Sequence, residues 1–418
     1  MPAAYRDRLV ETLLRDRLEQ LSALLVVGPR AAGKSTTLER FVKTVVRLDR
    51  PAEAAAFEAD PDAALAALEE PALLDEWQNV PQVLGAVRRA VEKSPGPGRF
   101  IVTGSVNAEL ENQVWPGTGR LTRVPMYPMT VREQLGGAAG HSFLDRVIAG
   151  DELRPAAHSP DLNGYLELAL RSGFPHAALN LTGSSRADWL ESYISDLLTH
   201  DVAQIDGRSA GSGRRRDSHR LRRYFSAYAL NSAGLAEHTT IFTAAGVTRP
   251  TAELYEELLE DLFVTERIDA WWSNQLKRLT QQPKRYVIDA ALMAAVLRVD
   301  AAGAMRDGNI LGRIIDTFVA AQLRPERVIS EARPGLFHLR TKNNRQEIDL
   351  LAEVSSGQLI AFEVKAGSAP GSEDARHLAW LRDQNPTQFV AGIVFHTGPD
   401  TFRLGDRISA APISCLWA

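Results

Sequence analysis

One segment near the start of the chain has the residue types and spacing of a phosphate-binding loop. Gly28 and Gly33 lie five positions apart and are followed by Lys34 and Ser35, which fits the pattern G-x-x-x-x-G-K-[ST]. Glycine lets the chain turn tightly enough for successive backbone N–H groups to surround phosphate oxygens. The lysine reaches the outer phosphates, and the serine hydroxyl ligates Mg²⁺. The sequence therefore predicts a nucleotide site formed by Gly28, Pro29, Arg30, Ala31, Ala32, Gly33, Lys34, Ser35 and Thr36.

Two carboxylates and a hydroxyl are expected to complete this site. Asp75 and Glu76 directly follow the apolar run 71–74. We expect Asp75 to hold Mg²⁺ through water, and Glu76 to polarise the water that attacks the terminal phosphate. Ser105 ends a later apolar run and is the predicted sensor of that phosphate, with Asn107 as the alternative.

A cation is also expected to stabilise the charge of the transferring phosphoryl group. Arg120 follows a glycine-rich stretch and is the first candidate, and Arg123 competes with it. The sequence leaves open whether Arg120 acts in its own site or in that of a neighbouring subunit. A plain surface arginine explains the same residue.

A second group of carboxylates lies near the C-terminus. Asp349 lies on one predicted strand, and Glu363 and Lys365 lie on the next. Alternate residues of a strand share a face, so all three can meet, as in the PD-(D/E)xK nuclease fold. Carboxylate oxygens suit Mg²⁺ or Mn²⁺, and Lys365 would orient or activate water. Asp316, on a predicted helix before these strands, would add a third acid.

Composition limits the classes of protein that fit. The chain has 418 residues with a formal net charge of −4, which excludes a uniformly basic coat for nucleic acid but not a local basic groove. The single cysteine, Cys415, excludes an internal disulfide, and its apolar neighbours predict a buried side chain. No apolar run approaches the ~20 residues of a membrane span, and the first residues do not show the apolar core expected of a signal peptide. We expect a cytoplasmic protein.

The pattern of apolar residues predicts three domains. Residues 1–150 alternate between strands at 22–27, 44–48, 71–75 and 100–103 and helices, which is typical of a parallel α/β sheet. Residues 151–300 are mostly helical, with two helices at 221–233 and 251–262 joined by a turn and followed by strand-like runs, an order that suggests a winged helix. Residues 301–418 predict a helix, three strands, a second helix and a further strand.

The motifs together resemble one family. The loop, the segment Leu74-Asp-Glu-Trp-Gln78, the segment Ile101-Val-Thr-Gly-Ser105 and Gly119-Arg120 occur in the order seen in prokaryotic AAA-type ATPases with an uncharacterised C-terminal region. Ser172-Gly-Phe-Pro175 and residues 283–289 resemble that family too. The resemblance implies ATP as the nucleotide and a P-loop AAA-type sheet, and it leads us to expect Glu where this chain has Asp316. The shorter side chain puts cleavage activity in doubt.

Two further features could contact a partner. Arg214, Arg215, Arg216, Arg220, Arg222 and Arg223 form a basic segment that suits the phosphates of DNA or RNA, or is simply a solvated loop and helix face. Trp271 and Trp272 could stack on bases, but we expect them to pack a domain interface.

Two functional hypotheses follow. In the first, the protein is an Mg²⁺-dependent AAA-type ATPase coupled to a winged-helix-like middle domain and a restriction-endonuclease-like C-terminal domain that engages nucleic acid. In the second, it is a nucleotide-dependent switch, or a stress or toxin-type effector, whose nuclease-like domain is catalytically silent and binds a protein partner. A homo-oligomer is compatible with either.

Overall fold

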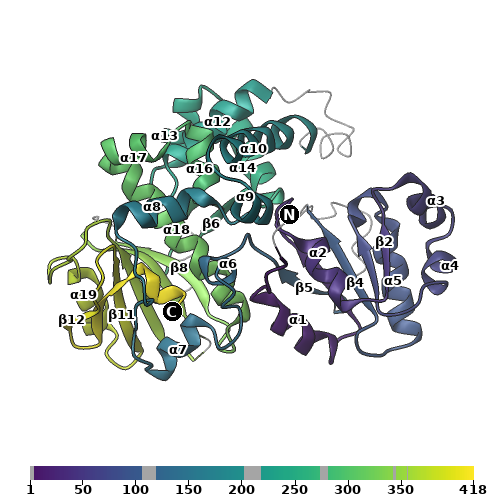
Figure 1. Ribbon diagram of the computed structural model, residues 1–418, viewed down its shortest axis with the longest axis horizontal. Coiled ribbons are helices and arrows are strands. Elements are labelled where there is room, and N and C mark those ends of the chain that lie inside the picture. Colours follow the sequence, from purple (N-terminus) through teal and green to yellow (C-terminus); the bar gives the residue numbers. More distant parts are fainter. Residues whose placement is uncertain (1–3, 106–118, 202–217, 274–280, 342–344, 355) are drawn as a thin grey trace.

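The chain folds into two α/β bodies that are joined after strand β5 (Thr122–Pro125). The computed structural model describes residues 4–105, 119–201, 218–273, 281–341, 345–354 and 356–418. Figure 1 shows the N-terminal body on the right, in purple and blue, and the rest of the chain on the left.

The N-terminal body is built on a five-stranded parallel sheet in the order β2-β3-β4-β1-β5. Its strands are β1 (Ala23–Val27), β2 (Thr44–Arg47), β3 (Ala72–Asp75), β4 (Phe100–Gly104) and β5. Because all five run in the same direction, the carboxyl ends of β1, β3 and β4 meet at one edge. The register confirms this, since Val27 is level with Gly104 and Asp75 with Thr103.

Helices cover both faces of this sheet because alternate strand residues point to opposite sides. On β1, Leu25 and Val27 pack into one core, whereas Leu24 and Val26 pack into another. The first core lies under α3 (Pro51–Ala59), α4 (Pro61–Ala66) and α5 (Gln82–Lys93), and the second lies under α1 (Val10–Leu18) and α2 (Lys34–Leu38).

The four strands expected from the sequence are therefore confirmed, and a fifth was missed. Strand β5 escaped prediction because Thr122 and Arg123 are exposed at the edge of the sheet and break the apolar run. The expected helix after the loop is also shorter, since α2 ends at Leu38 and a 3₁₀ turn follows.

The second body begins with helices that pack away from the N-terminal sheet. Residues of α6 (Val131–Gln134) and α7 (Phe143–Ala149) belong to the large core of this body, although they fall in the first of the three predicted domains. The other helices of the middle segment are α8 (Leu162–Arg171), α9 (Pro175–Asn180), α10 (Gly183–Asp196) with the π-helix Leu197–Asp201, α12 (Ser218–Leu230), α13 (His238–Ala245), α14 (Arg249–Asp261), α16 (Ala290–Leu297) and α17 (Ala301–Arg306).

Three of these helices precede a two-stranded antiparallel sheet. Helices α12, α13 and α14 are followed by β6 (Thr265–Ile268) and β7 (Lys284–Val287), which we call the β6–β7 hairpin. The sequence missed α13 but predicted the helices and strands on either side of it. The winged-helix class stays a prediction. All four residues of β7 are buried, so this strand faces the protein interior.

The C-terminal segment adds a six-stranded mixed sheet in the order β12-β13-β11-β10-β9-β8. Helix α18 (Gly308–Ile329) precedes β8 (Gly335–Arg340), β9 (Glu347–Glu353) and β10 (Leu359–Val364), which form an antiparallel meander. Then follow α19 (Arg376–Gln384), β11 (Phe389–His396), β12 (Phe402–Gly405) and β13 (Ile408–Pro412). The expected helix, three strands, helix and strand are present, and β12 and β13 were not foreseen. The restriction-endonuclease-like class stays a prediction.

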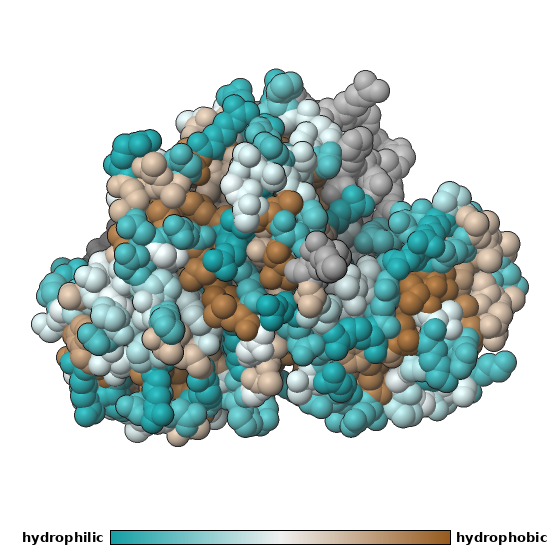
Figure 2. Space-filling model, in the orientation of Figure 1, coloured by the Kyte–Doolittle hydropathy of each residue, from teal (hydrophilic) through white to brown (hydrophobic). Residues whose placement is uncertain are grey.

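Buried ion pairs hold the two bodies together through α6. Arg8, before α1, contacts Glu133 at 2.9 Å and also donates to the carbonyl of Ala32 in the loop. Arg132, which precedes Glu133 in α6, contacts Glu326 of α18 at 3.0 Å. A cleft of about 1030 Å³ opens beside this joint, between α1, β5 and the end of α18. Figure 2 shows the outline of the molecule notched at its lower edge between the two bodies.

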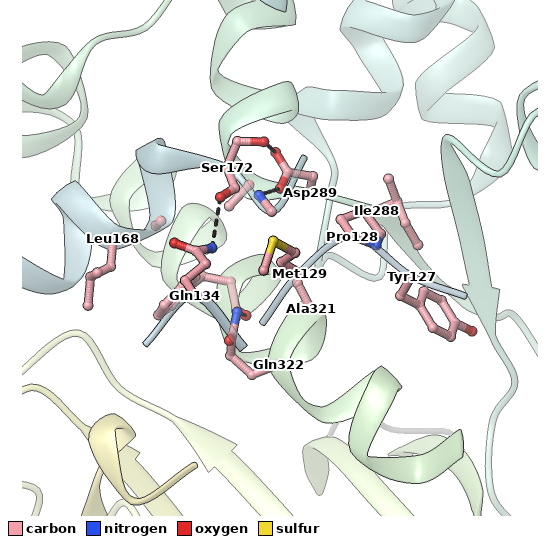
Figure 3. Close-up of a pocket in the computed structure, with 14 residues that line it drawn as sticks. Tyr127, Pro128, Met129, Gln134, Leu168, Ser172, Ile288, Asp289, Ala321 and Gln322 are labelled. Carbon is pink, nitrogen blue, oxygen red and sulfur yellow. Dashed lines mark hydrogen bonds between the residues drawn. The ribbon is translucent and has the colours of Figure 1, made fainter. Parts of the chain in front are cut away.

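Polar contacts around a small cavity of about 20 Å³ complete the joint (Figure 3). Asp289, which follows β7, accepts hydrogen bonds from the Ser172 hydroxyl at 3.2 Å and from the Gly173 N–H at 2.8 Å. Gln134 of α6 donates to the carbonyl of Ser172 at 3.0 Å. The hairpin, α8 and α6 are thereby fixed to one another.

Breaking the pair at the joint should destabilise the whole chain. We expect Glu326→Ala to lower the free energy of unfolding by about 3–5 kcal/mol, because it leaves the Arg132 charge buried without its counterion. Chemical denaturation measures this loss. The exposed Glu331 is the matched control, and Glu331→Ala should change stability by no more than about 0.5 kcal/mol. Equal losses in the two variants would contradict this account.

Candidate functional site

The predicted phosphate loop connects the carboxyl end of β1 to the first turn of α2. Gly33 caps α2 with a left-handed backbone (φ 90°), which glycine adopts without strain. At Gly28 the carbonyl oxygen of Met126 lies only 2.0 Å from where a Cβ would be, so a side chain is excluded there. The backbone thus follows the path that the G-x-x-x-x-G-K-[ST] spacing predicts, with the loop at the N-terminus of a helix.

Lys34 is buried inside this loop. Its Nζ donates to the carbonyl oxygens of Gly28 at 2.8 Å and Pro29 at 2.9 Å. Burial lowers the pKa of Lys34 to about 8, and the nearby carboxylates of Glu76 and Asp75 oppose part of this shift. An ammonium group that contacts only neutral carbonyls in a buried place can gain strongly from an anionic ligand.

Asp75 faces the same loop from the end of β3. Its side chain is buried close to Ser35, whose hydroxyl acts to lower its pKa, and Oδ1 has no hydrogen-bond partner among the described residues. Burial raises the pKa of Asp75 above its ordinary value. A hydroxyl beside a carboxylate oxygen that is buried and available suits Mg²⁺, which Ser35 and Asp75 would hold. The guanidinium of Arg47 approaches Asp75 to 3.6 Å, a contact that the sequence did not suggest.

Glu76 has a left-handed backbone (φ 57°) and lies beside Ser105. The Ser105 hydroxyl donates to Glu76 Oε2 at 3.2 Å, and Gln78 contacts the same oxygen. Arg30 of the loop donates to Ser105 Oγ at 3.3 Å. The structure therefore brings the predicted water-polarising residue and the predicted sensor together. It adds Gln78, which the sequence gave us no reason to assign a role. Asn107 lies outside the described residues.

Helices of the second body reach the outer side of the loop. Tyr193 of α10 donates to the carbonyl of Arg30 at 3.4 Å, and Pro175 at the start of α9 lies against Gly33. Figure 1 shows α9 and α10 above the end of α2. Only the resemblance of Ser172-Gly-Phe-Pro175 to the ATPase family could have pointed to this contact.

Arg120 does not reach the loop of its own chain. It precedes β5, whose first residue, Thr122, is level with Leu24 at the start of β1. Arg120 therefore lies at the amino edge of the sheet, opposite the loop, where it approaches Glu92 to 3.7 Å. An action on the phosphates of its own site does not fit this place. An action in a neighbouring subunit stays a prediction. Arg123 of β5 is level with Leu25 in the middle of β1.

The structure brings the predicted C-terminal acids together. Asp316 on α18, Asp349 on β9, and Glu363 and Lys365 at the end of β10 line one cavity of about 610 Å³. Lys365 approaches Glu363 to 3.3 Å. Burial raises the pKa of Glu363 well above its ordinary value, and the adjacent Asp349 adds to this.

A lysine that the sequence did not single out stands among these acids. Lys284 of β7 contacts Asp316 Oδ2 and Asp349 Oδ1, each at 2.9 Å. Burial raises the pKa of Asp316 to about 6 despite Lys284. Burial by itself would raise the pKa of Asp349, but the charge of Lys284 outweighs burial and lowers this pKa below its ordinary value.

The predicted metal site at Asp316, Asp349 and Glu363 is not supported. Lys284 already supplies a positive charge between two of the three carboxylates. Within the described ranges, no group of three or more histidine, cysteine, aspartate or glutamate side chains could hold a metal ion.

Comparison with known proteins supports the N-terminal assignment. Residues 20–135 match the AAA domain family model. Together with the parallel sheet and its loop, this match decides the type of the N-terminal body. It is an AAA-type, P-loop ATPase-like domain. Residues 162–303 match a domain of unknown function, DUF8612, and residues 311–416 match another, DUF4143.

Whole-chain relatives have no assigned function. Two uncharacterized proteins, from Mycobacterium bovis and Mycobacterium tuberculosis, are each 28% identical over 405 residues, which cover 96% of this chain and 82% of theirs. Among solved structures, the Walker-type ATPase of Pyrococcus abyssi overlaps with a TM-score of 0.40 at 15% identity, over 68% of this chain and 93% of that one. The Aeropyrum pernix Orc1 protein in complex with DNA overlaps with a TM-score of 0.29 at 14% identity, over 71% of this chain and 94% of that one. These overlaps are too weak to support an argument about sites.

The structure also places several of the other predicted features. Cys415 is buried, as expected, and burial raises its pKa to about 11. Trp271 packs into the C-terminal core and donates to Glu353 at 3.0 Å, so the expected packing role is confirmed for it. Arg222 approaches Glu191 to 3.2 Å, whereas Arg214, Arg215 and Arg216 lie outside the described residues. No helix in the described parts of the chain is both long and apolar enough to cross a bilayer.

The low pKa of Lys34 predicts a pH dependence of nucleotide binding. The charged ammonium binds phosphates, and the free protein loses that proton above pH 8. Binding must then take up a proton, so the affinity for ATP should fall by up to about tenfold per pH unit above pH 8. Calorimetry between pH 7 and pH 9.5 measures this slope. Lys34→Arg keeps its charge throughout and should show no such fall, while a flat profile for the unchanged protein would contradict the prediction.

Proposed function

We propose that this protein is an Mg²⁺-dependent ATPase whose N-terminal site binds and hydrolyses ATP. The observation that carries the proposal is the meeting of Lys34, Ser35, Asp75 and Glu76 at the carboxyl edge of the parallel sheet. These four groups come from two separate segments, and each has the chemistry that phosphoryl transfer to water requires.

Each residue has a separate task. The N–H groups of the loop and of the first turn of α2 bind phosphate oxygens, and Lys34 exchanges its two carbonyl contacts for the outer phosphates. Ser35 and Asp75 would hold Mg²⁺, and the ion would neutralise charge on the phosphates. Glu76 orients and polarises water, and Ser105 and Gln78 hold the Glu76 carboxylate in place.

Single substitutions separate binding from hydrolysis. Lys34→Ala should abolish ATP binding and turnover. Glu76→Gln should keep binding but lower the turnover number by about a hundredfold or more, because the amide cannot accept a proton from water. Phosphate release and calorimetry measure the two effects. Glu58→Gln, an exposed glutamate of α3, is the matched control and should leave both unchanged. Unchanged turnover in Lys34→Ala would overturn the proposal.

For the C-terminal domain we propose the second of the two hypotheses, a domain that does not cleave nucleic acid. The specific observation in favour is Lys284, whose ammonium lies between Asp316 and Asp349, where a nuclease of the predicted class would need a metal ion. The departure from the expected Glu at position 316 supports the same conclusion. ATP binding would then switch the affinity of this domain for a macromolecular partner.

A cleavage assay decides between the two hypotheses. We expect no metal-dependent cleavage of plasmid or single-stranded DNA, or of RNA, above that of the Asp349→Ala and Glu363→Ala variants. The assay is run with Mg²⁺ and with Mn²⁺, with and without ATP. Cleavage that disappears in both variants would restore the nuclease hypothesis and refute the silent domain.

A further inference from the structure

Lys284 lies in a position built for an ammonium group. It belongs to the middle segment, yet its side chain is only 1% exposed and reaches the acids of the C-terminal segment. Its Nζ meets three acceptors, Asp316 Oδ2 at 2.9 Å, Asp349 Oδ1 at 2.9 Å and the Asp349 carbonyl at 3.4 Å. A lysine ammonium has three N–H donors, so these acceptors match its full capacity.

The surrounding groups fix the acids in the same arrangement. Tyr286 lies two residues further along β7 and donates to the other oxygen of Asp316 at 3.1 Å. The N–H of Val364 donates to Asp349 Oδ2 at 3.0 Å. Both aspartates are therefore held on both oxygens, and Lys284 provides the positive charge between them. Lys365 contacts Glu363, which lies next to Asp349.

We propose that Lys284 is the resident cation of this acid cluster, and that the cluster latches the β6–β7 hairpin to the C-terminal sheet instead of holding a divalent metal. The carboxylates that the fold would offer to a metal are then used to bind a strand of the middle segment. This inference rests on the proposal that the C-terminal domain does not cleave nucleic acid. Its tests measure metal binding and thermal stability, and they need neither nucleotide nor nucleic acid.

The latch also decides where the hairpin lies relative to the ATP site. Thr265 and Arg267 of β6, with Pro283 just before β7, line a cleft of about 970 Å³ whose opposite wall includes Gly28 and Pro29 of the phosphate loop. The hairpin thus separates this cleft from the acid cavity. Displacement of the hairpin and release of the acids are therefore the same event.

Two more contacts tie the hairpin to its surroundings. Glu266 of β6 contacts the buried Arg324 of α18 at 2.6 Å. Phe263, just before β6, packs against the core of the AAA domain on the α3–α5 side. The chain that leads into the hairpin thus contacts the AAA domain, and Lys284 fixes β7 to the acids of the C-terminal segment.

Removal of the lysine tests the latch directly. Lys284→Ala leaves the two aspartates without their cation and opens space beside them. The full-length chain carrying Lys284→Ala should gain stoichiometric Mn²⁺ binding in calorimetry without nucleotide, whereas the unchanged protein shows none at this site. The double variant, which carries both Lys284→Ala and Asp349→Asn, should not bind this Mn²⁺ ion. Mn²⁺ binding by the unchanged protein that Asp349→Asn abolishes would overturn the proposal, as would failure of Lys284→Ala to gain it.

A second set of variants covers the case in which Lys284→Ala folds poorly. Loss of the ammonium leaves buried uncompensated carboxylates, so the melting temperature should drop. Neutralising them as well, with Asp316→Asn and Asp349→Asn in the same chain, should recover much of that drop. A triple variant no more stable than Lys284→Ala would show that the charges do not form a latch. These melting experiments do not depend on ATP turnover, so failure of the ATPase proposal would leave their result unaffected.

Discussion

The phosphate loop and the C-terminal acid cavity both depend on one constraint, the burial of a positively charged lysine. A buried ammonium group is costly unless an anion or a full set of acceptors compensates it. Lys34 donates to the carbonyls of Gly28 and Pro29 and contacts no carboxylate directly among the described residues, and burial lowers its pKa to about 8. Lys284 has two carboxylates, which outweigh burial and raise its pKa well above the ordinary value. The first lysine is prepared for an anionic ligand, whereas the second is already neutralised.

This difference explains why the phosphate loop suits a bound ligand, whereas the C-terminal acids do not suit a metal ion. At the AAA domain's loop, Asp75 keeps a buried oxygen that has no partner in the described part of the chain, and Ser35 lies beside it, so the site suits Mg²⁺ and phosphates. In the C-terminal cavity the aspartates are used on both oxygens by Lys284, Tyr286 and the N–H of Val364. Aspartate is therefore positioned for a ligand at the end of β3, whereas on α18 and β9 it is bonded within the protein.

The joint between the bodies connects these two centres. Arg8 links the loop carbonyl of Ala32 to Glu133, and the adjacent Arg132 links to Glu326 on α18, the helix that carries Asp316. The β6–β7 hairpin forms a second connection, since it lies between the cleft beside the loop and the acid cavity. A change in the loop on ATP binding would reach the C-terminal cavity through such packed elements, among them the contact of Tyr193 with the carbonyl of Arg30.

The sequence alone determined the phosphate loop, its carboxylates and four strands of the N-terminal sheet, because local spacing and buried apolar runs encode them. It also predicted that Asp316, Asp349, Glu363 and Lys365 would meet. It could not place Arg120 at the opposite edge or find β5, because an exposed edge strand has no apolar pattern. Nor could it assign Lys284 to the acids, since that lysine comes from a different segment and its contact exists only once the hairpin packs against α18 and β9. Tertiary structure therefore decided the chemistry of the C-terminal cavity, because the charge at its centre depends on which distant side chain is buried there.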